Sequence, residues 1–267
     1  MSDSASVNRS SRDTVSIIPI EGIGEIHAGD DLGTIIGDAI ETSTGSLQDG
    51  DIVIVTHKIV SKAEGRLVAL ESVTPSALAT QWANEWDKDA RQVEVVLREA
   101  KRIVRMHRGL ILAETKHGFI CANAGVDASN AGAETVCLLP DDPDASAAAI
   151  HQELTTRFFP GTDSGGRQVG VIVTDSFGRP WRNGIVNIAI GVAGISPFAD
   201  YRGQHDPDGY ELRASVLAVA DELASAAELV MHKVHQRPVA IVRNYEWVAN
   251  SGSAQELVMP HERNLFP

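Results

Sequence analysis

The amino-acid sequence predicts a mixed α/β (α+β) fold. Short, continuous apolar runs, typical of buried strands, recur along the chain between longer segments with helical periodicity. The two kinds of segment do not alternate strictly, and the Gly-rich fingerprint of a doubly wound nucleotide-binding sheet is absent. A chain of 267 residues is long enough to bury one large core without disulfide staples.

Four elements are predicted in the first part of the chain. Pro19 places the first strand at a sheet edge, because proline cannot donate to a strand ladder. Asp30 or Asp31 is positioned to cap the first helix. Over residues 75–104, apolar residues recur at helix-like intervals and are separated by charged residues. In order, the elements are a strand over residues 15–20, a helix over 32–42, a buried strand over 52–55 and a long helix over 75–104.

The rest of the chain predicts more strands than helices. Acidic residues stand at the start of the alanine-rich segment over residues 144–158, where their negative charge complements the dipole of a helix. In order, we expect a strand pair over 109–112 and 118–121, a loop over 123–130, a helix over 144–158, a flexible connection over 161–166, strands over 169–174 and 185–193, an amphipathic helix over 216–234 and a strand over 239–242.

One domain is predicted over residues 15–247. Residues 1–14 are Ser-rich and polar, and predict a disordered leader without the apolar stretch of a signal peptide. Residues 248–267 are a C-terminal tail with little pattern. No apolar run reaches the roughly 18 residues of a membrane span, so we expect a cytoplasmic protein that does not bind membranes.

The charge of the chain restricts its partners. A formal net charge of −13 disfavours nucleic acid and anionic lipid, because both require phosphate neutralisation. A phosphorylated ligand would therefore need a local group of cations or a metal. The two cysteines have no C-x-x-C spacing, which argues against a structural zinc site. P-loop, H-E-x-x-H and G-x-S-x-G motifs are also absent.

A basic segment directly follows the buried strand over 52–55. Residues 56–66 contain His57, Lys58, Lys62 and Arg66. Lysine supplies a mobile charge and arginine a planar fork, and both suit polyphosphate. The alternative is a surface loop whose charged side chains interact only with solvent.

An acidic loop over residues 125–130 is the second candidate. Asp127 and Asn130 present hard oxygen atoms from a short, Gly-containing turn. Such oxygens suit Mg²⁺ or Mn²⁺. The alternative is an Asx turn, in which these side chains bond to their own backbone.

The third candidate, residues 174–184, begins where an apolar strand is expected to end. Asp175 could hold a divalent cation, Ser176 a second cation or water, and Arg179 and Arg182 could clamp phosphate. The alternative is a capping Asp and surface-paired arginines. Two acidic loops and one basic loop together are what phosphoryl transfer requires, because cations must neutralise the transferred phosphate.

In combination, these segments resemble the coenzyme F420:L-glutamate ligases, also called F420-0:γ-glutamyl ligases. The similarity covers about residues 15 to 245. The matching stretches, in order, are residues 18–25 (IPIEGIGE), 50–66, 125–130, 173–184 (VTDSFGRPWRNG), 206–212 (DPDGYEL) and 219–229.

The resemblance implies a substrate set of GTP, L-glutamate and F420-0, with Mg²⁺ or Mn²⁺, two divalent cations per site, and K⁺ as a further cation. It also implies an intertwined homodimer. Nucleotide contacts fall on Ile23, Gly24, Glu25, Ile26, His57, Lys62 and Asn130, and metal contacts on Asp127, Asp175 and Ser176. The chain departs from the family pattern at His57, where Ser is commoner, at Ser176, where Thr is usual, and at His232, where Gly is usual.

The implied reaction is amide formation through an acyl phosphate, with one or more glutamates added. In this hypothesis Lys62, Arg179 and Arg182 neutralise developing charge. Two alternatives stay open. One is another metal-dependent carboxylate–amine ligase or phosphoryl-transfer enzyme on the same scaffold. The other is a nucleotide-binding module without catalysis.

Overall fold

The computed structural model describes residues 14–161 and 169–264 and contains a five-stranded central sheet. The strand order is β1-β12-β2-β8-β9, and only β2 and β8 run parallel. The strands are β1 (Ser16–Ile20), β12 (Val239–Arg243), β2 (Ile52–Thr56), β8 (Gly170–Arg179) and β9 (Arg182–Ala193). Most of the predicted leader and of the 161–166 connection lie outside the described residues.

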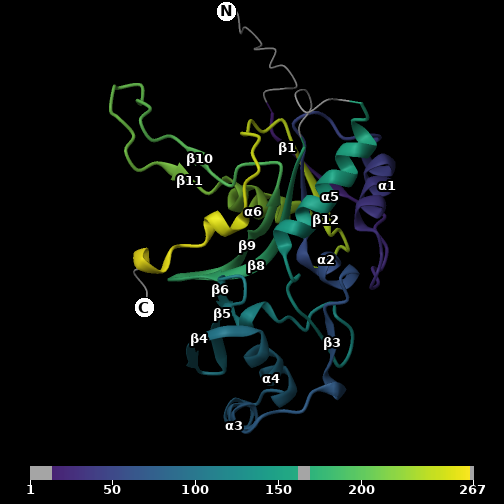
Figure 1. Cartoon of the computed structure of the whole chain (residues 1–267), viewed down its shortest axis with the longest axis vertical. Coiled ribbons are helices and arrows are strands. Elements are labelled where there is room, and N and C mark those ends of the chain that lie inside the picture. The colour runs from purple at the N-terminus through teal and green to yellow at the C-terminus, as the bar shows by residue number, and fades with distance from the viewer. Residues whose placement is uncertain (1–13, 162–168, 265–267) are drawn as a thin grey trace, which may run out of the picture.

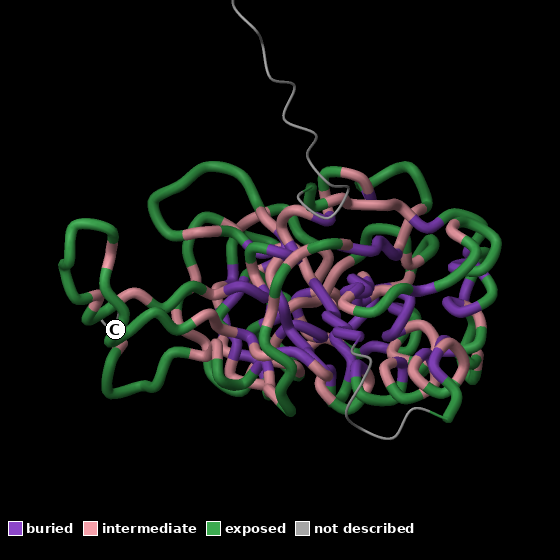
Figure 2. The backbone as a smooth tube through the Cα atoms, turned by 90° about the horizontal axis from the view of Figure 1, so that it is seen from above, coloured by how far each residue is buried: buried purple, intermediate pink, exposed green. Residues whose placement is uncertain are grey.

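Helices cover both faces of this sheet (Figure 1). Alternate residues of β2 point to opposite faces. Val53 and Val55 pack with α1 (Leu32–Thr44), α2 (His57–Ala63) and α5 (Pro143–Phe158). Ile52 and Ile54 pack with α6 (Val219–Met231) on the other face. The buried residues gather in the middle of the body, between exposed loops (Figure 2). A two-sided apolar sheet therefore explains the continuous apolar runs in the sequence.

A second layer lies below the central sheet in Figure 1. Its small core joins α3 and α4 to the face of a three-stranded antiparallel sheet. Two short strand pairs complete the fold, and one of them, β10–β11, lies at the base of a projecting arm. The elements are α3 (Ala77–Trp86), α4 (Ala90–Glu99), β4 (Ala100–His107), β5 (Leu110–Thr115), β6 (Ile120–Ala122), β3 (Leu67–Ala69), β7 (Thr135–Cys137), β10 (Ala199–Asp200) and β11 (Val216–Leu217).

Most predicted elements are confirmed, including the capping of α1 by Asp31, whose side chain accepts from the backbone N–H of Thr34. The single helix over residues 75–104 is wrong. Asp87 ends α3 in a left-handed conformation with φ of 51°. The chain then re-enters a helix and becomes strand β4 at Ala100. Strand pairing with β5, reinforced by Lys101 and Glu114, outweighs the helical periodicity there.

Three other boundaries differ from the sequence prediction. Residues 57–63 form helix α2 and not a loop. Strand β8 does not end at Asp175 but continues to Arg179 and turns directly into β9, so the third candidate segment is a β-hairpin. The helix predicted over 216–234 is α6, which begins after the short strand β11 and ends at Met231, where His232 has a positive φ of 56°.

The C-terminal segment packs against the body. Ser253 caps a short 3₁₀ helix, Ala254–Leu257, and its hydroxyl donates to Asp144 at 2.6 Å. A second 3₁₀ turn follows at His261–Arg263. Within the described ranges, no helix is both long enough and apolar enough to cross a bilayer.

Candidate nucleotide and metal site

The parallel pair β2–β8 brings the basic segment next to the third candidate segment. Thr56 pairs with Thr174 in register, so the next residues, His57 and Asp175, meet at the carboxyl ends of the two strands. His57 is buried, and its Nε2 lies 3.2 Å from Asp175 Oδ1. Its Nδ1 lies 3.3 Å from the hydroxyl of Ser61, one helical turn on. Asp175 is therefore tied to the first turn of α2.

The next residue of α2 holds the other predicted metal carboxylate. Lys58 Nζ lies 2.8 Å from Asp127 Oδ2 and donates to the Ser129 carbonyl at 2.9 Å. A β-bridge between Asp127 and Cys137 fixes the backbone of this loop. Asp127 and Asp175, far apart in sequence, thus contact consecutive residues of one helix.

The Asp127 loop also forms an Asx turn, which was the alternative to a metal site at this loop. The Ser129 backbone N–H donates to Asp127 Oδ1 at 2.6 Å, and the Ser129 hydroxyl donates to Oδ2 at 3.1 Å. Burial raises the pKa of Asp127, but the hydrogen bonds from Lys58 and Ser129 and the charge of Lys58 outweigh it. The net pKa lies below its ordinary value, so this carboxylate is charged at neutral pH and suited to a cation.

The last turn of α2 contacts the predicted nucleotide segment. Lys62 Nζ is hydrogen-bonded to the carboxylate of Glu25, and this bond is the main reason that the pKa of Glu25 is lowered. Ile23 and Ile26 are buried and anchor the segment in the core, whereas Gly24 and Glu25 are exposed. The anchored apolar residues leave the backbone between them open to a ligand.

A surface cavity of about 360 Å³ lies beside this segment. Residues 21–24 form one wall and residues 235–237 the other. Glu21 and Arg237 join the two walls by an ion pair of 2.5 Å. The cavity thus connects the predicted nucleotide segment to the loop after α6.

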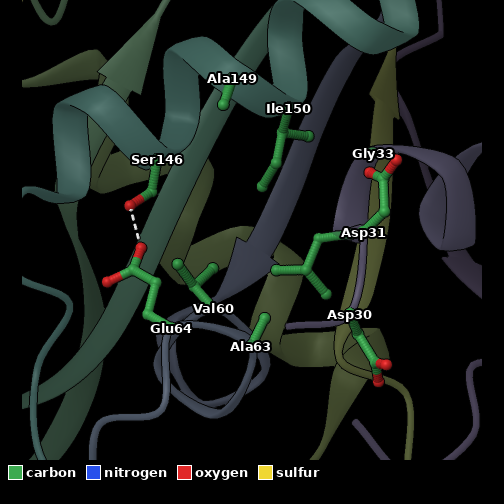
Figure 3. A pocket seen from close by; sticks show the side chains of 10 residues that line it. Asp30, Asp31, Gly33, Val60, Ala63, Glu64, Ser146, Ala149 and Ile150 are labelled. Carbon is green, nitrogen blue, oxygen red and sulfur yellow. Dashed lines mark hydrogen bonds between the residues drawn. The ribbon is translucent and has the colours of Figure 1, made fainter. Parts of the chain in front are cut away.

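Another cavity, of about 260 Å³, lies on the other side of α2 and contains none of the predicted site residues. Figure 3 shows Val60, Ala63 and Ile150 among its side chains, with Glu64 hydrogen-bonded to Ser146. Its walls come from α1, α2 and α5.

Several predicted site residues are not brought to Asp175. Ser176 follows Asp175 on β8 and points to the opposite face. There its hydroxyl donates to Asn187 Oδ1 at 2.7 Å and contacts Lys233. The Ser176 hydroxyl is therefore not grouped with the Asp175 carboxylate.

The two arginines lie at the tip of the β8–β9 hairpin. Arg179 pairs in register with Arg182 across the turn, and Arg179 donates to the Asn183 carbonyl at 3.1 Å. Arg179 lies four positions after Asp175 along the extended strand, about 13 Å away along the backbone. Within the described residues, no hydrogen bond or ion pair joins either arginine to Asp175. Asn130 is exposed, in a left-handed conformation with φ of 55°.

Over residues 14–161 and 169–264, no group of three or more His, Cys, Asp and Glu side chains is arranged to hold a metal ion. A cation at Asp175 would therefore take most of its ligands from a bound phosphate and water, as Mg²⁺ commonly does. Burial and then the charge of Asp175 raise the pKa of the nearby Cys121 thiol to about 12. At neutral pH that thiol is therefore protonated.

Two contacts of the site were missed by sequence reasoning. The sequence predicts Lys58 only as one cation of the basic segment. Its ion pair with Asp127 joins residues 69 positions apart, so it depends on the tertiary structure. The cluster of Ser176, Asn187, Glu228 and Lys233 joins β8, β9 and α6. No short motif marks it. The β-rich stretch around Asn187, with one polar residue among apolar ones, was the available signal.

Comparison with known proteins identifies relatives over most of the chain. The family model F420-0:Gamma-glutamyl ligase matches residues 22–244. The coenzyme F420:L-glutamate ligase of Methanothermobacter thermautotrophicus is 41% identical over 94% of this chain and 98% of its own length. Proteins of the same name from Methanopyrus kandleri and Methanocaldococcus jannaschii are 43% and 41% identical, over 86% and 82% of this chain and 86% of each relative. The chain therefore belongs to the F420-0:γ-glutamyl ligase family.

Proposed function

We propose that this protein is a GTP-dependent ligase that joins L-glutamate to F420-0 in an amide bond. The names of its relatives support the two substrates that are joined. The observation that carries the nucleotide and metal part is the position of α2. Consecutive residues, His57 and Lys58, contact two carboxylates that are far apart in the sequence. Lys62 of the same helix contacts the exposed segment at Glu25.

The proposed reaction has two steps. A carboxylate oxygen of F420-0 attacks the γ-phosphorus of GTP, the bond to the bridging oxygen breaks, and GDP leaves with the electron pair. The amine of L-glutamate then attacks the acyl carbon, the bond from carbon to phosphate oxygen breaks, and the amine proton is lost to solvent. Activation is needed because a free carboxylate is a poor acyl donor, whereas phosphate is a good leaving group.

The residues of this chain position and neutralise the phosphates in that scheme. Lys62 lies mostly buried beside the exposed nucleotide segment, where its charge opposes that of the β- and γ-phosphates. Lys58 holds Asp127 in a charged, fixed orientation. Addition of further glutamates would use the same residues, since each new product again ends in a carboxylate.

The residues at Asp175 fit a divalent cation. Asp175 is a partly buried carboxylate, and the adjacent His57 Nε2 is a buried polar atom without a hydrogen-bond partner. Asp127 and Asp175 are the residues that would hold Mg²⁺ or Mn²⁺, two cations in all, with K⁺ as a further ion. When bound, such cations supply Lewis acidity and orient the triphosphate.

The proposal includes a homodimer. The β8–β9 hairpin exposes two large apolar side chains near its tip, Trp181 at 83% and Ile185 at 59%. Exposed apolar groups at one site commonly mark an interface. Sedimentation velocity tests this: we expect a dimer for the natural chain and a monomer for the double variant Trp181→Ser, Ile185→Ser. A monomeric natural chain would refute this part.

The activity is tested with purified protein, F420-0, L-glutamate, GTP and Mn²⁺, with the coenzyme product identified by mass spectrometry. We expect a mass increase of one or more glutamyl residues, dependent on GTP. Asp175→Ala should abolish it, whereas Glu71→Gln, at an exposed acidic residue away from the site, should not. An unchanged coenzyme mass would refute the assignment. GTP consumption with other carboxylates and amines would then indicate a different ligase, and binding without turnover a nucleotide-binding module.

A further inference from the structure

The exposed segment over residues 21–25 neutralises neighbouring cations with its own carboxylates. Glu25 is hydrogen-bonded to Lys62, in the last turn of α2. Glu21, at the other end of the segment, forms the ion pair with Arg237 of the loop after α6. A Cβ on either of the two glycines between them would meet no atom within 4 Å, so the space over this backbone is open. A ligand that enters this space meets cations that are already paired.

The two members of the Lys62–Glu25 pair differ in how firmly they are held. The Lys62 side chain is 13% exposed and extends from a helix that packs in the core, whereas the Glu25 side chain is 68% exposed. Within the described ranges, the Glu25 carboxylate forms no hydrogen bond except the one with Lys62. The carboxylate can therefore move into water, whereas the ammonium stays where it is and needs a counter-charge.

A phosphate can supply that counter-charge better than the carboxylate does. Phosphate carries more charge and more acceptor oxygens, and its bond to an ammonium is charge-assisted. Within residues 14–161 and 169–264, the backbone N–H groups of Gly24 and Glu25 form no hydrogen bond. These donors lie on the residue that contacts Lys62 and on the one before it, and consecutive backbone N–H groups suit an anion.

The carboxylate competes with such an anion at neutral pH. The hydrogen bond from Lys62, and then the charge of Lys62, lower the pKa of Glu25 below its ordinary value, and burial opposes this only weakly. Glu25 is therefore ionised where an anionic ligand would bind.

We propose that Glu25 is an internal counter-ion of the nucleotide site, whose carboxylate occupies Lys62 until the terminal phosphates of a nucleoside polyphosphate displace it. This inference rests on the proposed function, since it concerns how the same nucleotide reaches Lys62. Displacement breaks the ion pair, so a phosphate that contacts Lys62 binds more weakly than it would to an unpaired ammonium. Glu25 is thus a positioning residue that acts on the nucleotide through Lys62.

The test is calorimetric titration of the full chain with GDP in the presence of Mn²⁺. Glu25→Gln and Glu25→Ala should each bind GDP about fivefold more tightly than the natural chain, as expected for an ion pair with one exposed member. The matched control is Glu64→Gln, which removes an exposed carboxylate that lies two residues after Lys62 and bonds to Ser146. Screening by salt should keep its GDP affinity within about twofold of the natural value.

A second background shows whether the gain passes through Lys62. Lys62→Met alone should weaken GDP binding, because it removes the cation. Glu25→Gln added to Lys62→Met should bring no gain, because no ammonium is left to be freed. Loss of structure does not produce tighter binding, and circular dichroism confirms that each variant is folded.

Four outcomes are distinguishable. A gain in GDP affinity that requires Lys62 supports the inference. Unchanged or weaker GDP binding in both folded Glu25 variants overturns it and leaves the GTP-dependent ligase intact. A gain that persists without Lys62 also overturns it, because the effect is then one of overall charge. Absence of GDP binding to the natural chain overturns both the inference and the nucleotide part of the proposed function.

Discussion

The ion pair between Asp51 and Arg243 supports the central sheet that positions the site. Asp51 precedes β2, is fully buried, and receives two hydrogen bonds from the guanidinium of Arg243, Nε to Oδ1 at 2.8 Å and Nη2 to Oδ2 at 2.7 Å. The Gln48 backbone N–H also donates to Asp51, at 2.8 Å. Arg243 is the last residue of β12, the antiparallel neighbour of β2. The pair therefore joins the middle strand of the sheet, β2, to its neighbour β12.

Arg243→Met should strongly destabilise the protein. It leaves the Asp51 carboxylate in the interior without its counter-charge, which costs about 3–5 kcal/mol. For a domain of this size, the melting temperature falls by roughly 2–4 °C per kcal/mol, so we expect a drop of about 6–20 °C. Thermal and urea unfolding followed by circular dichroism measure both quantities.

The double variant Asp51→Asn, Arg243→Met separates the buried charge from the lost packing. Asparagine keeps an oxygen that accepts from Gln48 and carries no charge, so the double variant should be more stable than Arg243→Met alone. The reasoning is refuted if Arg243→Met costs less than about 1 kcal/mol, as at a surface pair. It is also refuted if the double variant is as unstable as the single one.

Three further predictions follow from single contacts. Lys58→Met removes the partner of Asp127 and should weaken GDP–Mn²⁺ binding about tenfold in calorimetry, and unchanged affinity would contradict the role given to Lys58. A Cβ on Gly191 would lie 2.1 Å from a backbone carbonyl oxygen at the start of α5. Gly191→Ala should therefore lower the free energy of unfolding in urea by about 3 kcal/mol. The control Gly178→Ala places its Cβ in open space and should lower it far less. Burial lowers the pKa of His151 below its ordinary value. At a pH between the two pKa values, the unfolded chain binds a proton that the folded chain does not. The free energy of unfolding should therefore fall as the pH drops below about 6.5. His151→Gln should flatten that part of a stability–pH curve, and an unchanged slope would refute this origin.

The sequence predicted the elements with strong local signals. The apolar runs of β2 and β8 and the Asp31 cap of α1 were predicted because each depends on neighbouring residues alone. The strand β4 was missed because its charged residues also fit a helical period, and only pairing with β5 decides between the two. Local pattern therefore failed where tertiary pairing chose the structure.

The candidate site was only partly predictable for the same reason. The residue types of the three segments indicated phosphate and metal chemistry, but the contact between His57 and Asp175 depends on the parallel register of β2 and β8. No sequence pattern gives that register. The hairpin also turns Ser176 to the opposite face from Asp175, a consequence of strand alternation that could not be seen while this segment was predicted as a loop.

In the proposed function, Asp127 and Asp175 act on one bound nucleotide through their contacts with α2. The direct measurement is calorimetric binding of GDP with Mn²⁺ to Asp127→Asn, Asp175→Asn and the double variant. If both carboxylates serve one site, each single variant loses most of the affinity, and the double variant differs from the sum of the single losses by about 0.5–3 kcal/mol. Losses that add to within about 0.5 kcal/mol would show two independent sites and contradict the account.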